Sequence, residues 1–503
     1  MKKRIKILAA AFSVCLAALA VRAEYIQIEG HEELGEAARM QQSLKINGTD
    51  TRSIIYDRNG ARITDSSTNY VYIIKRNMLD MNARRLLRAA DAVEGDKTND
   101  TYAIYHTENK NQNIREELEK TCNAYVIETG SRYSANQPAA HILGYLNGNK
   151  GAAGIELKYQ SRLYSAGNST FVYTDGEGNI LKGAGPYVSY AENVFLTTID
   201  LQIQKSTEKI LKECEYDSAA VVLETKTGNV LAIASTPAYS PQQMAELLGS
   251  SSGCLVNKAL QSYPPGSIFK IVTAAAALEA GNVTDETEFY CTGEESFGDI
   301  KIKCMAAHGK LNLQEAFAKS CNCAFIQLGQ RAGYEAVKNM AQKMGIGTKA
   351  LDFSEESCGQ ITAQQEAAGA GIANMAIGQG ALLASPVQVA RITNIIANGG
   401  IDKGIHIISE KQKNRRAVSK KTADKITAMM RAVTVYGTGA GSAVPMCAGK
   451  TGSAEAGNMI HGWFTGFFPY DEPEYTITVF CEDGKSGGNS ALKLFDQIAE
   501  TLR

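Results

Sequence analysis

The sequence predicts an α+β protein whose larger, C-terminal domain has an antiparallel sheet covered by helices. Strand-like segments at 219–223 and 230–234 flank a turn, and two further strand-like segments follow at 463–468 and 475–480. Helical patterns dominate the residues between these two pairs, from 267 to 397. Strands, then helices, then strands that return to the same sheet are typical of an α+β domain.

The composition narrows the class of protein. A length of 503 residues fits two or three domains, and 44% hydrophobic with 21% charged residues is ordinary for a globular protein. The 52 basic and 53 acidic side chains give a net charge of -1, which offers no basic field for nucleic acid. Six widely spaced histidines without an H-E-x-x-H pair argue against a His-rich metal site. Chemistry on Ser, Lys, Asn or Cys is therefore expected.

The N-terminus has the charge pattern of a segment that enters a membrane. Four cations within residues 1–6 precede an uncharged apolar run at 7–21. This run is shorter than the about 20 residues that span a bilayer, and Val21-Arg-Ala23 resembles a cleavage site. A membrane anchor is favoured over a signal peptide cleaved after Ala23, and residues after about Glu24 are expected outside the cytoplasm.

Three regions follow from these patterns. Residues 1–23 are expected to form a cytoplasmic tip and a membrane helix. Residues 24–190 are expected to form a smaller α+β module without an obvious catalytic cluster, and residues 191–503 the catalytic domain.

Eleven cysteines are present, and some could pair in an exported protein. Cys291 and Cys304 bracket a turn-rich stretch and are the best local candidates for a disulfide. Reduced thiols remain the alternative.

Three short patterns, S-x-x-K, S-x-N and K-[ST]-G, recur in serine acyl-transfer enzymes. Each occurs more than once, so that only its context can select the functional copy. The copies begin at Ser206, Ser267 and Ser490, at Ser67 and Ser320, and at Lys226, Lys450 and Lys485.

Ser267 is the strongest candidate nucleophile. It follows a Pro-Pro-Gly turn and begins a helix that is apolar nearly all round, which predicts burial. Lys270 is the only charge in that helix before Glu279, and it lies one turn from Ser267 on the same face. A neutral Lys can activate a Ser hydroxyl when burial and a second cation depress its pKa. By contrast, Ser206 lies on a highly charged helix, and Ser490 lies close to the C-terminus.

Lys450 could be the second cation. Lys450-Thr-Gly-Ser453 runs towards an apolar strand, and an edge strand there could present its side chains to a substrate carboxylate. Ser320-Cys-Asn322 follows a helical run and could place its hydroxyl between the two lysines. The competing copies at Lys226 and Lys485 read as a hairpin turn and a flexible loop.

The ordered motifs resemble those of class B penicillin-binding proteins, the membrane-anchored, monofunctional D,D-transpeptidases of peptidoglycan synthesis. The resemblance covers nearly the whole chain after residue 50. Beyond the three motifs it is carried by segments 52–60, 151–156, 196–200, 227–232, 265–270, 308–311, 378–386, 397–400 and 462–464.

The resemblance implies the penicillin-binding, serine β-lactamase-like fold for the catalytic domain and a role for each motif. Ser267 would attack the D-Ala-D-Ala amide of a stem peptide and form an acyl-enzyme. Lys270 would be the base, and Ser320 would relay a proton to the leaving amine. The implied substrate-binding residues are Asn322, Lys450, Thr451, Gly452 and Ser453, with the backbone amides of Ser267 and Ser453 as the oxyanion hole.

The resemblance also implies the molecules that meet the protein. No metal or organic cofactor is implied. Stem peptides, β-lactam antibiotics and a polytopic membrane glycosyltransferase are the implied partners, and the catalytic domain would lie on the extracytoplasmic face of the cell membrane.

Other readings stay open at this point. A serine β-lactamase shares the fold, although the chain has no Glu-x-x-Leu-Asn motif and has Ser-x-Asn where class D enzymes have Ser-x-Val. A weakly active scaffold of a wall-synthesis complex and a D,D-carboxypeptidase share the motifs. The sequence does not distinguish elongation, division and sporulation.

Overall fold

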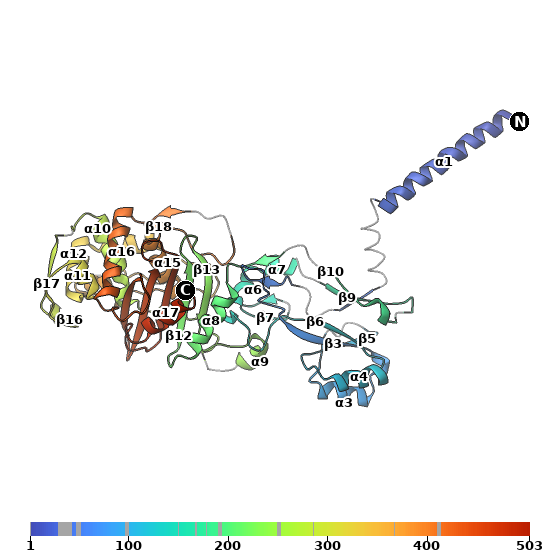
Figure 1. Cartoon of the computed structure of the whole chain (residues 1–503), viewed down its shortest axis with the longest axis horizontal. Coiled ribbons are helices and arrows are strands. Elements are labelled where there is room, and N and C mark those ends of the chain that lie inside the picture. The colour runs from blue at the N-terminus through green and yellow to red at the C-terminus, as the bar shows by residue number, and fades with distance from the viewer. Residues whose placement is uncertain are drawn as a thin grey trace. The chain divides into compact units, whose positions relative to one another are not determined.

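A computed structural model describes residues 2–28, 43–46, 52–95, 100–148, 150–165, 169–177, 179–189, 194–248, 253–284, 286–366, 368–409 and 414–503. The chain folds into two compact units, whose elements are labelled in Figure 1. The first unit comprises residues 1–53, 67–132 and 162–193, and the second comprises 54–66, 133–161 and 194–503. Residues 54–66 and 133–161, which precede the expected boundary at 190, therefore belong to the second unit. The chain passes from the first unit to the second for the last time at residues 193–194, close to that boundary.

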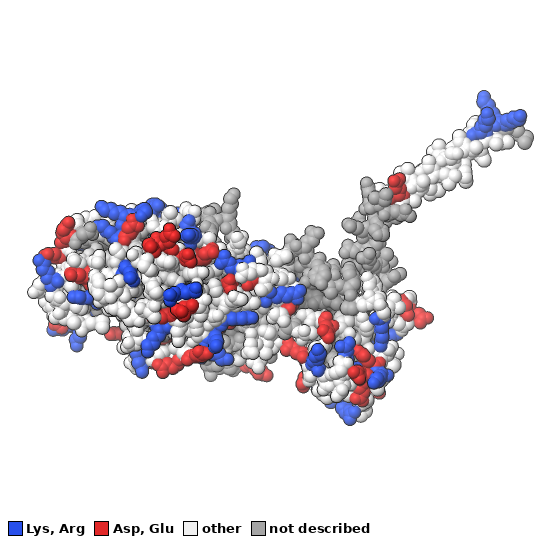
Figure 2. All heavy atoms as spheres, viewed as in Figure 1, with Lys and Arg blue, Asp and Glu red and all other residues white. Residues whose placement is uncertain are grey.

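The N-terminal helix α1 (Lys2–Ile28) is longer than the apolar run at 7–21. Within Lys2–Tyr25 an 18-residue window reaches a mean hydropathy of 2.0, so that the helix is long and apolar enough to cross a membrane. The 24 residues of Lys2–Tyr25 extend about 36 Å as a helix, whereas the hydrocarbon core of a bilayer is about 30 Å thick. Figure 2 shows basic residues (blue) at its N-terminal end, then an uncharged stretch (white), and acidic atoms (red) near its other end.

The rest of the first unit is built on two antiparallel sheets. The four-stranded sheet has the order β4-β5-β3-β6, and the three-stranded sheet has the order β1-β9-β10. Helices α3 (Met81–Ala89) and α4 (Gln112–Thr121) pack on one face of the larger sheet over an apolar cluster that includes Tyr72 and Leu118. The strands are β1 (Ser43–Ile46), β3 (Ser67–Lys75), β4 (Val93–Glu94), β5 (Tyr102–Thr107), β6 (Tyr125–Ser131), β9 (Ser169–Tyr173) and β10 (Pro186–Ser189).

The second unit is centred on a five-stranded antiparallel sheet of the order β13-β12-β22-β21-β20. Its strands confirm the predicted segments. They are β12 (Ser218–Glu224), β13 (Asn229–Ser235), β20 (Ala448–Ala456), β21 (Met459–Phe468) and β22 (Tyr475–Cys481). The strand that carries Lys450 lies at the edge of the sheet, as expected.

Helices cover both faces of this sheet. Helices α8 (Leu201–Lys212) and α17 (Ala491–Glu500) pack on one face, over a core that includes Phe464 and Val479. On the other face lies α15 (Pro386–Ala397), which is hydrogen-bonded to strand residues that alternate with those of this core. Thr393 Oγ1 on α15 lies 2.7 Å from Thr465 Oγ1 on β21. Alternate residues of a strand point to opposite faces, so these contacts identify a sheet buried between two helical layers.

Short strands interrupt the region in which helices were predicted. Four strands between residues 288 and 312 form the pairs β14·β17 and β15·β16, between α10 and α11. These strands are β14 (Glu288–Cys291), β15 (Glu294–Phe297), β16 (Ile300–Lys303) and β17 (Gly309–Asn312). Each has only four residues, too few to establish a period of two in the sequence.

The remaining described elements are short or belong to the helical layer. The helices are α5 (Ala140–Leu143), α6 (Gly154–Lys158), α7 (Gln160–Ser165), α9 (Met244–Leu247), α10 (Lys270–Glu279), α11 (Leu313–Ala318), α12 (Asn322–Ala332), α13 (Tyr334–Lys343), α14 (Ala370–Ala376) and α16 (Lys420–Val435). The strands are β2 (Ile55–Tyr56), β7 (Leu146–Asn147), β8 (Lys150–Gly151), β11 (Phe195–Leu196), β18 (Ile401–Asp402) and β19 (Arg415–Arg416).

Candidate active site

Ser267 lies in a 3-10 turn, Gly266–Phe269, that leads directly into the buried helix α10. The turn packs closely on strand β20. Gly266 has φ +53°, and a Cβ placed on it would lie 2.5 Å from the carbonyl oxygen of Ser453. Only glycine adopts that conformation at low cost and allows such an approach. The Pro-Pro-Gly turn thus places the candidate nucleophile against the third motif.

Lys270 is completely buried at the start of α10, as the apolar sequence around it predicted. Its ammonium group donates to the carbonyl oxygen of Ser320 over 2.7 Å, to Ser320 Oγ over 3.2 Å and to Asn322 Oδ1 over 2.8 Å. Its Nζ also lies 5.5 Å from the centre of the Phe325 ring. Three acceptors and an aromatic face offset part of the cost of burying this group.

Lys450, on β20, is also completely buried, and it approaches Ser320 from the sheet, whereas Lys270 approaches from α10. Its Nζ donates to Ser320 Oγ over 3.0 Å and to its neighbour's carbonyl, Thr451 O, over 2.9 Å. The structure therefore places the Ser320 hydroxyl between the two lysines, as the sequence suggested. Ser320 itself has φ +52°, a left-handed conformation that is uncommon outside glycine and that clusters at functional sites.

The burial of the two lysines changes their acidity. Desolvation lowers the pKa of Lys270 to about 8, although the neighbouring thiols of Cys321, Cys304 and Cys323 act in the opposite direction. Desolvation, together with the charge of Lys270, holds the pKa of Lys450 well below its ordinary value. Roughly a tenth of Lys270 is therefore neutral at pH 7, and a neutral amine can accept a proton.

The side chains that face solvent lie around these buried groups. Ser267 and Asn322 are half-buried, and Ser453 is exposed. On β20, Thr451 Oγ1 lies 2.5 Å from Thr438 Oγ1, and Ser453 Oγ accepts a hydrogen bond from the Gly487 amide over 3.3 Å. A partly exposed rim over two buried cations suits a substrate with an anionic end.

The Ser267 hydroxyl has no hydrogen-bond partner within the described part of the chain. Lys270 instead bonds the second motif, Ser320 and Asn322. Activation of Ser267 by Lys270 therefore stays a prediction. Hydrogen bonds of a catalytic base are often long or absent without substrate and tighten in the complex.

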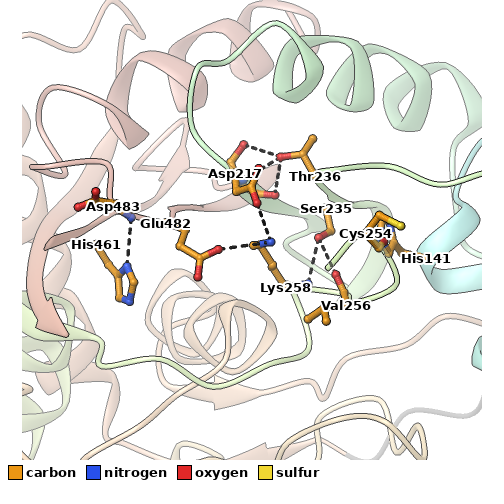
Figure 3. Close-up of polar contacts among 11 residues, drawn as sticks. His141, Asp217, Ser235, Thr236, Cys254, Val256, Lys258, His461, Glu482 and Asp483 are labelled. Carbon is orange, nitrogen blue, oxygen red and sulfur yellow. Dashed lines mark hydrogen bonds and ion pairs between the residues drawn. The ribbon is translucent and has the colours of Figure 1, made fainter. Parts of the chain in front are cut away.

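Ion pairs of the buried Lys258 with two partly exposed carboxylates support the loop that leads to Ser267. Lys258 is nearly buried, and its Nζ lies 3.1 Å from Asp217 Oδ2 and 3.3 Å from Glu482 Oε2 (Figure 3). Asp217 precedes β12, and Glu482 follows β22. On the same loop, Pro264 accepts a hydrogen bond from the Trp463 indole over 3.0 Å. The loop is thus tied to three strands of the sheet, which fixes the position of the turn at Ser267.

Four side chains next to the second motif could hold a metal ion. They are Cys291, Cys304, His308 and Cys321. Cys291 and Cys304, which were the best local candidates for a disulfide, are both free thiols in this structure. The sulfur of Cys304 lies 3.8 Å from the sulfur of Cys321. Sequence reasoning missed this group because its two halves are separated by the whole of β17 and α11.

The comparisons with known proteins identify the family of this chain. The family model described as the penicillin-binding protein transpeptidase domain matches residues 218–500. The peptidoglycan D,D-transpeptidase PbpA of Mycolicibacterium smegmatis is 31% identical over 334 residues, which cover 57% of this chain and 67% of that protein. Stage V sporulation protein D of Bacillus subtilis is 26% identical over 532 residues, which cover 95% of this chain and 82% of that protein.

Solved structures show the same fold. A chain of a peptidoglycan synthase complex, studied for its coordination of polymerization and crosslinking, superposes with a TM-score of 0.71 at 25% identity, covering 99% of this chain and 97% of that chain. The penicillin-binding protein PBP2 of Helicobacter pylori, solved in complex with MreC, has a TM-score of 0.72 at 22% identity, covering 92% of this chain and 98% of that chain.

Proposed function

Because the chain belongs to the class B penicillin-binding proteins, we propose that it is a peptidoglycan D,D-transpeptidase that cross-links stem peptides through an acyl-enzyme on Ser267. One observation carries the proposal. Two completely buried lysines, Lys270 and Lys450, meet at the hydroxyl of Ser320, beside the turn that presents Ser267. Two buried amines that share a buried hydroxyl, beside the half-buried Ser267, can form a site for acyl transfer without a histidine.

Acylation begins at Ser267. Neutral Lys270 takes the proton from Ser267 Oγ as this oxygen attacks the carbonyl carbon between the last two D-Ala residues. The oxygen of the tetrahedral intermediate then carries the negative charge. The amides of Ser267 and Ser453 would donate to it, and the close packing of the turn at Gly266 on the Ser453 backbone supports this proposal.

The leaving amine needs a proton before the peptide C–N bond breaks. Ser320 Oγ is bonded to both lysines, so it can pass a proton from the lysine pair to that nitrogen. The terminal D-Ala departs, and the acyl group stays on Ser267. An amine of a second stem peptide then attacks the ester, and the same groups transfer its proton in reverse.

Substrate orientation falls to Asn322 and the edge strand β20. The Asn322 side chain can bond the peptide backbone of the donor. Lys450, Thr451, Gly452 and Ser453 are the residues proposed to hold the terminal carboxylate. Gly452 has no room for a side chain, since a Cβ there would lie 2.8 Å from Ile268 Cγ1. This close packing keeps the strand against the nucleophile's turn.

A β-lactam would follow the same acylation route. Its strained amide mimics the scissile bond, and opening the ring leaves the leaving group tethered to the enzyme. The tethered group blocks the approach of an acceptor amine, so the covalent adduct persists.

The helix α1 is proposed to be a single-pass membrane anchor, with the catalytic domain on the extracytoplasmic face. The proposed partners are the peptidoglycan stem peptides and a polytopic membrane glycosyltransferase that supplies glycan strands. The occurrence of a similar chain in a peptidoglycan synthase complex supports this pairing.

In the direct test, the full chain in detergent is incubated with a stem peptide that ends in D-Ala-D-Ala and with an amine acceptor. Release of D-Ala with equimolar cross-linked product supports the proposal, and Ser267→Ala should abolish both. D-Ala release with hydrolysed peptide alone would identify a carboxypeptidase. Rapid turnover of penicillin without any action on the peptide would identify a β-lactamase.

A further inference from the structure

Two free thiols, those of Cys214 and Cys481, meet on the face of the central sheet that α8 and α17 cover. Cys214 follows the end of α8, and Cys481 is the last residue of β22. Cys481 is completely buried in the core under these helices, and the half-buried Cys214 packs against that core. A hydrogen bond joins the two side chains, with the Cys481 thiol as donor and the Cys214 sulfur as acceptor. The proposed acyl transfer uses neither of them.

The sheet holds the backbone around this pair. Cys481 lies opposite Ser218, at the start of β12 and only four residues after Cys214. One residue further on, the Glu482 amide donates to the Asp217 carbonyl over 2.8 Å. The short segment from Cys214 to Ser218 is therefore fixed beside the end of β22. Two cysteines that lie far apart in the sequence are brought together by strand pairing, which leaves little freedom for their sulfurs to separate.

The surroundings give the two thiols different acidity. The Cys214 sulfur accepts from the Cys481 thiol and, over 3.4 Å, from the Tyr216 amide. The bond from Cys481 is the main cause that holds the pKa of Cys214 below its ordinary value, although burial and the Glu215 charge act in the opposite direction. Donation to Cys214, together with burial, raises the pKa of Cys481. The accessible thiol is thus the better nucleophile, and the buried one stands behind it.

We propose that Cys214 and Cys481 are a redox-active pair that closes to a disulfide when the protein meets a disulfide oxidant. The Cys214 thiolate attacks one sulfur of the oxidant and expels the other as a thiolate, which leaves a mixed disulfide on Cys214. Cys481 then loses its proton and attacks the Cys214 sulfur, and the second half of the oxidant departs as a thiolate. The two cysteines together lose two protons and two electrons, and the oxidant is reduced to two thiols.

The bond would lock the frame that supports the loop to Ser267. Asp217 and Glu482, the two carboxylates that pair with Lys258, lie three residues after Cys214 and directly after Cys481. The bond would also close a loop of roughly 270 residues, and a long loop loses much conformational entropy in the unfolded chain. The proposal does not depend on acyl transfer. It suits a domain outside the cytoplasm, where disulfides persist.

The first test maps the bond in the full chain in detergent. The protein is reduced, exchanged into oxidised glutathione, alkylated and digested with trypsin. Each cysteine is then the only one in its peptide, 213–226 or 451–485. The proposal predicts that these peptides are joined in most wild-type molecules. Recovery of both peptides alkylated, of a lasting glutathione adduct on Cys214, or of either peptide joined to another cysteine would overturn it. This result needs the wild type alone, so it stands if a variant fails to fold.

Matched variants test the order of attack. Cys481→Ser should keep glutathione on Cys214, because no second thiol displaces it, whereas Cys214→Ser should leave Cys481 unmodified. The control is Cys358→Ser, which alters an exposed cysteine elsewhere and should form the joined peptides like the wild type. Glutathione on Cys481 in folded Cys214→Ser, at the rate seen on Cys214 in Cys481→Ser, would contradict the assigned order.

Urea denaturation measures what the bond does to the fold. The oxidised wild type should unfold at a higher urea concentration than the same protein in dithiothreitol. Cys214→Ser should lose this difference, although its other cysteines can still be oxidised. An equal difference in the wild type and in Cys214→Ser would contradict the stabilising role of this bond.

Discussion

Lys270 and Lys450 donate to a single hydroxyl group, that of Ser320, over 3.2 and 3.0 Å. Both are completely buried, and one comes from the helix that follows Ser267 while the other comes from the sheet edge. Two ammonium charges so close together in a medium of low dielectric constant repel each other strongly. Their protonation is therefore coupled, and the Ser320 hydroxyl is the link between them.

The first prediction concerns the pH dependence of acylation. Because burial lowers the pKa of Lys270 to about 8, the neutral base becomes more abundant as pH rises through that value. The second-order rate of acylation by a fluorescent penicillin, measured from about pH 6 to 10, should rise with an apparent pKa near 8. This apparent pKa is a property of the coupled pair Lys270 and Lys450, and it includes the effect of the nearby thiols of Cys304, Cys321 and Cys323. A rate that is flat across this range would contradict the assignment of Lys270 as base.

A matched variant isolates the base. Lys270→Arg keeps a positive charge but stays protonated throughout, so the acylation rate should fall by about 10²–10⁴-fold and lose its dependence on pH. The unfolding free energy offers an independent check. Between the lowered pKa of about 8 and the ordinary value of 10.5, the folded protein binds fewer protons than the unfolded chain. The contribution of Lys270 to stability should therefore increase with pH across this window.

The second prediction concerns the contact between the nucleophile's turn and the third motif. Gly266→Ala introduces a Cβ 2.5 Å from the Ser453 carbonyl oxygen at a φ of +53°. We expect a loss of about 2–4 kcal/mol in the unfolding free energy, together with strongly slowed acylation. Gly281→Ala is the control, since Gly281 has φ +70° but open space around it. It should cost only about 1 kcal/mol and leave acylation unchanged. Equal effects of the two variants on acylation would refute the role of this contact.

The burial of Lys270 and the strands of the sheet were predictable from sequence because each rests on local signals. The apolar helix around Lys270 indicated burial, and the strand patterns at 219–234 and 463–480 indicated the sheet. The left-handed backbone of Ser320 had no such signal, because it is imposed by the fold and no side-chain preference marks it. The cluster of Cys291, Cys304, His308 and Cys321 depends on the pairing of four short strands, and no local sequence pattern reveals that pairing.

The division of the chain was also beyond local signals. Residues 54–66 belong to the second unit because β2 pairs in parallel with β11, Ile55 opposite Phe195. These partners lie far apart in the sequence. A strand of two residues gives no period from which to infer such a pairing.

The third prediction concerns the ion pairs of Lys258 with Asp217 and Glu482. Lys258→Ala leaves the partly exposed carboxylates of Asp217 and Glu482 without their cation and should lower the unfolding free energy by about 1 kcal/mol in urea denaturation. Lys212→Ala, at an exposed position on α8, should change it by less than about 0.5 kcal/mol. If the two variants are equally stable, the ion pair does not anchor the loop to the sheet.

The fourth prediction concerns α1. The full chain should stay with the membrane fraction after alkaline carbonate extraction, and deletion of residues 2–25 should release it. Intact mass separates an anchor from a signal peptide. A mature chain that begins at Glu24 and appears in the soluble fraction would show that the segment is removed after Ala23.

The central claim is that Ser267 carries the acyl group, and intact-mass spectrometry tests it most directly. The fragment from Glu24 onward is incubated with penicillin beside its Ser267→Ala variant, and the folding of each is checked by circular dichroism. The account predicts a gain of one drug mass, mapped to the Ser267 peptide, stable over hours and absent in the variant. An adduct that persists in the folded variant, or that maps to another serine such as Ser320, would contradict the account.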